Sequence, residues 1–93
     1  MNDVQFHKIA KALADPQRFE IYSMIARGPG EVPCKRLVKG FDVSQATISH
    51  HLKELVNVGL IDSRKDGQCA FLSVRRAVIE DYQKELRNRV SAG

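Results

Sequence analysis

The polar residues with the most distinctive spacing lie between positions 44 and 58 of the 93-residue chain. At 100° per residue, a helix over this segment has one apolar face, made of Ile48, Leu52, Leu55 and Val56. The opposite face, its flanks and the first turn carry Ser44, Gln45, Ala46, Thr47, Ser49, His50 and Lys53. Side chains of these types can meet base edges in the major groove of DNA, where a small residue can approach a thymine methyl. The pattern therefore favours a recognition helix, and a merely solvated polar face is the alternative.

The charge distribution agrees with a nucleic-acid partner. The chain has a net charge of +4, and residues 28–76 hold eight basic and five acidic side chains. Free N–H groups at the start of the helix, near Ser44 and Gln45, favour a phosphate oxygen. Arg64 and Lys65 add basic charge directly downstream. Double-stranded DNA is therefore the expected partner.

Other helices must position this segment. Apolar spacing predicts helices over 3–13 and 16–27, with Asp15 as the cap of the second and Pro16 as its first residue. The expected inward positions of the second helix are Phe19, Ile21, Tyr22 and Ile25. A short extended piece at 31–32 is followed by a brief helix from Pro33 to Gly40, and the turn 41–43 leads to Ser44, a favoured N-cap. Two helices joined by a tight turn predict a helix-turn-helix.

The period of the apolar residues changes after Gly59. Glycine readily adopts the left-handed backbone conformation that ends a helix. Residues 60–65 and 68–74 flank Asp66-Gly67, a pair suited to a two-residue hairpin turn. A last helix is expected over 75–89. We therefore predict a mainly α fold with a small β-hairpin wing, a winged helix-turn-helix in the order α-α-α-α-β-β-α, as a single domain over 1–93.

These residues resemble the ArsR/SmtB family of bacterial winged-helix repressors. The matching segments are Asp15–Arg18, Val43–Leu52, Gly59–Ile61 and Arg64–Gly67. The resemblance implies a homodimer built from the first and last helices, and repression through an operator in a promoter. It also implies DNA contacts from Ser44, Gln45, Ala46, Thr47, Ser49 and His50, and a basic wing at Arg64 and Lys65.

Apolar stripes remain on the two terminal helices once the winged-helix core is closed. They consist of Phe6, Ile9 and Leu13, and of Val78, Ile79, Tyr82, Leu86 and Val90. Pairing across a two-fold axis would bury both stripes, and folding back onto their own domain is the alternative. In a dimer, two recognition helices would read half-sites of a palindromic operator about 34–36 Å apart.

The resemblance also directs attention to metal sensing. The family's third-helix site uses two cysteines separated by one residue, but Pro33 and Lys35 stand at those positions and Cys34 stands at the spacer. The site in the family's last helix needs histidines, and none follows His51. His50 and His51 point about 100° apart on a helix. We therefore expect His50 to face DNA, His51 to brace the helix from its flank, and neither metal site nor cofactor to be present.

Cys34 and Cys69 raise a second sensing hypothesis. On this hypothesis, Lys35, Arg36 and a helix N-terminus lower the pKa of Cys34, and thiol oxidation couples the third helix to the wing. The alternative is two inert side chains in a reduced cytoplasm.

Several function classes are excluded or left open. The sequence has no Gly-rich phosphate loop and no recognised catalytic spacing of cysteine and histidine, so an enzyme is not expected. It has no apolar run of membrane-spanning length, and the expectation is a cytoplasmic protein without a membrane partner. The sequence does not identify an inducer. A winged helix that binds a partner protein remains the alternative to DNA binding.

Overall fold

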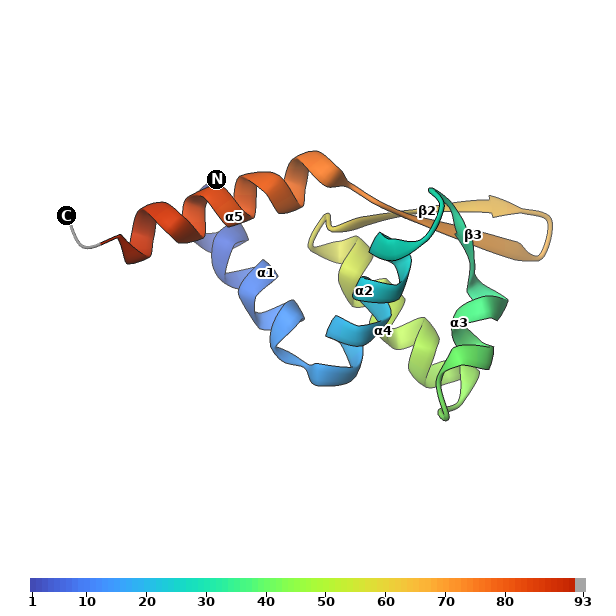
Figure 1. The fold of residues 1–93 in the computed structure, drawn as a ribbon. Coiled ribbons are helices and arrows are strands. Elements are labelled where there is room, and N and C mark those ends of the chain that lie inside the picture. Colours follow the sequence, from blue (N-terminus) through green and yellow to red (C-terminus); the bar gives the residue numbers. More distant parts are fainter. Residues whose placement is uncertain (92–93) are drawn as a thin grey trace.

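The computed structural model describes residues 1–91. The elements follow the order α1 (Asp3–Ala14), α2 (Pro16–Arg27), β1 (Val32–Pro33), α3 (Cys34–Gly40), α4 (Gln45–Asn57), β2 (Ile61–Asp66), β3 (Cys69–Val74) and α5 (Arg76–Val90). Figure 1 shows the β2–β3 hairpin extending at one end of the molecule and α5 at the other. The expected winged helix-turn-helix is confirmed.

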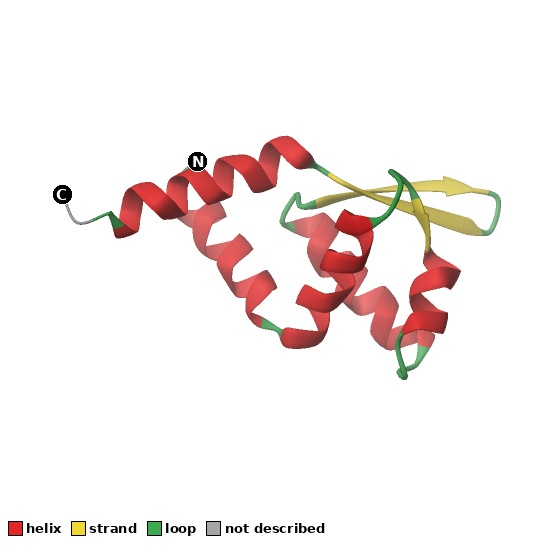
Figure 2. Cartoon of the chain, viewed as in Figure 1, coloured by secondary structure: helices red, strands yellow, loops and turns green. Residues whose placement is uncertain are grey.

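The sheet contains one strand more than expected. The extended piece before α3 is β1, which pairs antiparallel with β3, and the strand order is β1-β3-β2. Figure 2 shows how β1 leads directly into α3. Because this pairing fixes the start of α3 against the hairpin, the helix-turn-helix and the wing form one packed unit.

Local capping explains where the helices begin and end. The carboxylate of Asp15 accepts a hydrogen bond from the backbone N–H of Arg18 at 2.9 Å, and this bond holds the pKa of Asp15 below its usual value. Ser44 caps α4 in the same way, accepting from the N–H of Thr47 at 3.1 Å. After α4, Gly59 has a φ of +82°, which reverses the chain toward β2.

The hairpin turn lies one residue later than expected. Asp66 pairs with Cys69, so Gly67 and Gln68 form the two-residue loop. Gly67 has a φ of +63°, and within residues 1–91 only glycines have positive φ. A two-residue turn with glycine at its first central position matches the II′ pattern. The prediction of an Asp66-Gly67 turn was wrong because Asp66 keeps its extended conformation in the ladder.

The core lies between α2, α4 and the sheet. Its fully buried side chains include Ile9, Ile21, Ile25, Leu37, Ile48, Leu55, Leu60, Ile61 and Leu72. Two positions expected inside are exposed: Phe19 is 45% accessible and Val56 is 40% accessible. Phe19 lies about 200° around the helix from Ile21, on the opposite face. In α4 the buried stripe is rotated toward His51, and Val56 lies at its outer edge.

The apolar stripe of α1 is largely buried within its own chain. Phe6 is 7% exposed and Ile9 is fully buried, and the ring of Phe6 stacks on Tyr82 of α5 with centroids 5.0 Å apart. The expectation that this stripe is left over for a partner was therefore wrong for Phe6 and Ile9. By contrast, α5 has no buried residue, and both Leu86 and Val90 are exposed.

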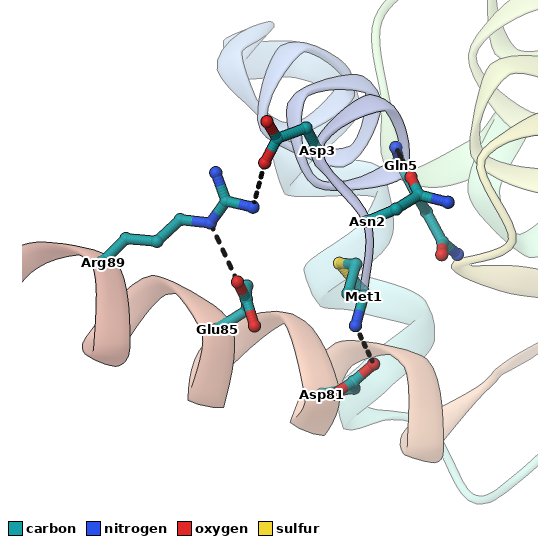
Figure 3. A network of polar contacts seen from close by, with 7 residues as sticks. All are labelled: Met1, Asn2, Asp3, Gln5, Asp81, Glu85 and Arg89. Atoms are coloured by element: carbon teal, nitrogen blue, oxygen red, sulfur yellow. Dashed lines mark hydrogen bonds and ion pairs between the residues drawn. The ribbon is translucent and has the colours of Figure 1, made fainter.

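A polar network also joins α1 to α5 (Figure 3). The guanidinium of Arg89 donates to Asp3 and, at 3.0 Å, to Glu85, and it lies 4.2 Å from the ring centroid of Phe6. The pKa of the Asp3 carboxyl is held low by this guanidinium. The network therefore links the last turns of α5 to the first turn of α1. None of the helices described in residues 1–91 is both long and apolar enough to cross a membrane.

Candidate nucleic-acid interface

Helix α4 presents a polar face because its opposite face is anchored in the core. Ile48 and Leu55 are fully buried and Leu52 is 7% exposed. The sequence-predicted contact residues that lie exposed on or beside the helix are Ser44, Gln45, Ala46, Ser49, His50 and Lys53. The first turn of α4 contains no acidic side chain, so nothing there repels a phosphate.

Thr47 differs from the other predicted contact residues. It is half-buried, and its Oγ1 lies 3.0 Å from the Oγ of Ser44 while its N–H donates to the same Oγ. The two hydroxyls are therefore engaged with each other at the helix start. Thr47 shapes the N-terminus of α4 more than it offers a free hydroxyl to a ligand.

His51 braces α4 from below, as expected, but it does so as a buried residue. It is 6% exposed, and its Nε2 lies 3.0 Å from Oε1 of Gln17 in α2. Since an amide oxygen only accepts, Nε2–H is the donor. Burial lowers the pKa of His51, and the buried Nδ1, which has no partner, is consistent with a neutral ring. The partner, Gln17, was not identifiable from sequence because it lies 34 residues away.

The wing arginine is already paired within the chain. Arg64 donates from Nε and from an Nη to the two carboxylate oxygens of Glu31, both at 2.8 Å, and its Cζ lies 4.8 Å from the ring centroid of Phe71. The pair lowers the pKa of Glu31 and raises that of Arg64. Lys65 is exposed and forms no ion pair within residues 1–91. Of the two expected wing cations, Lys65 alone is unpaired.

The hypothesis that its surroundings lower the pKa of Cys34 is wrong. Its thiol is half-buried against the core at the first position of α3, and burial raises its pKa. Lys35 and Arg36 are exposed, so they point away from the interior that holds the thiol. Cys69 is exposed at the start of β3. Within residues 1–91, no group of three or more His, Cys, Asp or Glu side chains is placed to hold a metal ion.

A helix-turn-helix followed by a β-hairpin, with polar side chains exposed along its second helix, defines a winged helix-turn-helix DNA-binding protein. A family model described as "Helix-turn-helix domain" matches residues 13–64. The chain is 34% identical over 86 residues to the arsenical resistance operon repressor of Staphylococcus aureus, covering 92% of this chain and 81% of that protein. It is 39% identical over 67 residues to the repressor of the same description from Staphylococcus xylosus, covering 72% and 62%.

A solved structure of a transcriptional regulator also matches this chain. The ArsR-like transcriptional regulator from Rhodococcus sp. RHA1 superposes with a TM-score of 0.80 at 25% identity, over 91% of this chain and 78% of that one. The chain belongs to the ArsR family of winged-helix transcriptional regulators, and it is a DNA-binding regulator of transcription. The resemblance inferred from sequence is confirmed.

Proposed function

We propose that this protein is a cytoplasmic, homodimeric repressor that reads a palindromic DNA operator through α4. The observation that carries the proposal is the division of α4 into a buried apolar face and an exposed polar face whose first two turns are uncharged. Gln45, Ala46, Ser49 and His50 read base edges in the major groove. Ser44 and Thr47 shape the helix start, where backbone N–H groups face a phosphate.

The basic side chains have different roles in this proposal. Lys53 on α4 and Lys65 on the wing contact phosphates, because both are exposed and free of ion pairs within residues 1–91. Arg64 positions the wing through Glu31. Phosphate contacts orient the protein on the duplex, and the base contacts of α4 choose the sequence.

The shape of the chain supports a second copy as the partner of α5. The radius of gyration is 13.9 Å, against about 12 Å for a compact domain of this length. Val4, Leu86 and Val90 are exposed by 64%, 41% and 71%, and the ion pair between Asp3 and Arg89 joins the two helices that carry them. An isologous contact between two copies buries this surface.

Selection of bound fragments from a random DNA pool tests the proposal. A palindromic product is expected, followed by fluorescence-anisotropy titration of that product and of random DNA. Gln45→Ala is expected to cost about 1–3 kcal/mol on the selected site and little on random DNA. Asn57→Ala, which removes an exposed amide at the other end of α4, is the matched control and leaves both affinities unchanged.

Failure of the pool to enrich any sequence argues for a protein-binding winged helix instead. Equal losses for Gln45→Ala on selected and random DNA argue against base reading by α4. Sedimentation measures the assembly separately: twice the 10.5 kDa chain mass is expected for the wild type. Leu86→Glu is expected to sediment as a monomer, because it places a charge in the proposed contact.

A further inference from the structure

Helix α3 carries a basic surface. Lys35, Arg36 and Lys39 are exposed, and α3 contains no acidic residue. At 100° per residue these three positions fall within a 100° arc. Leu37, which is fully buried, anchors the other side of the helix. These three residues, the α3 basic face, are therefore directed into solvent together.

Most other basic side chains of the helix-turn-helix and wing are committed to contacts within the chain. Arg64 is held by Glu31 at 2.8 Å and Arg75 faces Asp62 at 3.9 Å. Arg76 donates to the backbone carbonyl of Ala26 at 2.7 Å. Of the eight basic side chains in residues 28–76, the five without an ion pair or side-chain hydrogen bond to any residue of the described range 1–91 are Lys35, Arg36, Lys39, Lys53 and Lys65. Three of the five belong to the α3 basic face.

We propose that the α3 basic face is the principal phosphate-binding surface of this protein and that the wing arginine is not. The proposal rests on the proposed function and specifies how its affinity for DNA arises. In a helix-turn-helix bound to DNA, the first helix crosses the sugar-phosphate backbone while the second enters the major groove. Here α3 is that first helix, and only residues 41–44 separate it from α4.

The reason to expect the division of roles is electrostatic. A cation that is free in solution gains a phosphate neighbour and releases condensed counterions, which favours binding. A guanidinium that already has a bidentate carboxylate partner must either lose that partner or carry the carboxylate's negative charge toward the DNA. Arg64 is a guanidinium with such a partner, whereas Lys35, Arg36 and Lys39 are cations free in solution.

The salt dependence of DNA binding measures how many phosphate contacts come from the α3 basic face and how many come from Arg64. Each phosphate contact contributes about −0.9 to the slope of log K against log salt concentration. The triple variant Lys35→Gln, Arg36→Gln, Lys39→Gln is expected to reduce the magnitude of the slope by about 2.7 per subunit, or about 5 for a dimer. Arg64→Gln is expected to change the slope by less than about one unit per dimer.

The matched control removes the same charge elsewhere. Lys8→Gln, Lys11→Gln, Lys84→Gln neutralises three exposed lysines of α1 and α5 and is expected to leave the slope near the wild-type value. Circular dichroism and sedimentation confirm that each variant keeps its fold and assembly. The single variant Lys39→Gln, with an expected change of about 0.9 per subunit, provides the same test with the least disturbance.

The outcomes separate this proposal from the function on which it rests. If the wild type binds the selected operator but the α3 variants keep its slope, or lose no more than the control, the α3 proposal is overturned and the repressor function stands. A loss of about 0.9 per subunit in Arg64→Gln, with none in Lys39→Gln, reverses the assignment in favour of the wing. If the wild type binds no DNA at all, both proposals fail.

Discussion

The contact between Gln17 and His51 offers a direct test of how the recognition helix is held. The Nε2 of His51 lies 3.0 Å from Oε1 of Gln17, and this hydrogen bond links α4 to α2 beneath the polar face. Replacing Gln17 by Ala removes the acceptor and leaves a buried imidazole N–H without a partner. Replacing His51 by Ala removes the donor and also leaves a cavity, because the ring is 6% exposed.

The expected loss in the free energy of unfolding follows from the kind of hydrogen bond that is removed. A neutral hydrogen bond contributes about 0.5–1.5 kcal/mol net, and an orphaned buried donor costs about 1–3 kcal/mol. Gln17→Ala is therefore expected to lower the free energy of unfolding by about 1–3 kcal/mol, and His51→Ala by more because of its cavity. In the double variant the two losses are not additive, and a coupling of about 1 kcal/mol is expected.

Urea unfolding followed by circular dichroism at pH 7.5 measures the four proteins of this cycle. Protomer concentration is held constant, because a dimer's apparent stability depends on it. Operator affinity is measured on the same variants, and Gln17→Ala is expected to weaken it although Gln17 belongs to α2 and not to the polar face of α4. A coupling below about 0.3 kcal/mol, the level of independent sites, would refute the claim that this bond holds α4.

The same contact predicts a pH dependence. Burial lowers the pKa of His51 below its usual 6.5, so the unfolded chain takes up this proton at a higher pH than the folded chain does. Between the two pKa values the unfolded state binds more protons, and stability falls as the pH decreases through 6.5. Unfolding at pH 7.5 and 5.5 is expected to show this loss in the wild type and a smaller one in His51→Gln.

Three further predictions concern packing, the turn and the thiols. Leu55→Ala is expected to destabilise by about 2–5 kcal/mol and Val56→Ala by less than about 1 kcal/mol, since Leu55 is fully buried and Val56 is 40% exposed; equal losses in urea unfolding would contradict the burial pattern. Gly67→Ala is expected to cost about 1–2 kcal/mol because φ is +63°, and an unchanged midpoint would show that the turn adapts. A thiol-specific disulfide reagent is expected to label Cys69 before Cys34, and the reverse order would contradict the burial of Cys34.

The structural features that follow from the sequence are those that depend on neighbours along the chain. The caps at Asp15 and Ser44 and the reversal at Gly59 were all predicted, because each satisfies or ends a helix within a few residues. The polar face of α4 followed from its period. Errors arose at the margins of these patterns: Phe19 and Val56 were assigned to apolar faces that the core does not cover.

The strand β1 shows a different kind of limit. Val32 and Pro33 are too short a segment to be identified as a strand by alternation, and they form one only because Leu72 and Phe71 lie opposite. The same pairing brings the segment containing Glu31 beside the wing. As a result the charge of Arg64, which the sequence presents as free, is neutralised by a carboxylate 33 residues away.

The sequence by itself therefore determined the helices, the hairpin, the family and the polar face of α4, because backbone hydrogen bonding and helical period act over a few residues. Only the tertiary structure decided which charges and polar groups remain free. Gln17 holds His51, Glu31 holds Arg64, and Asp3 holds Arg89 across 86 residues. Side chains this far apart in the chain become partners only when packing brings their elements together, and that packing leaves Lys35, Arg36 and Lys39 as the free cations of α3.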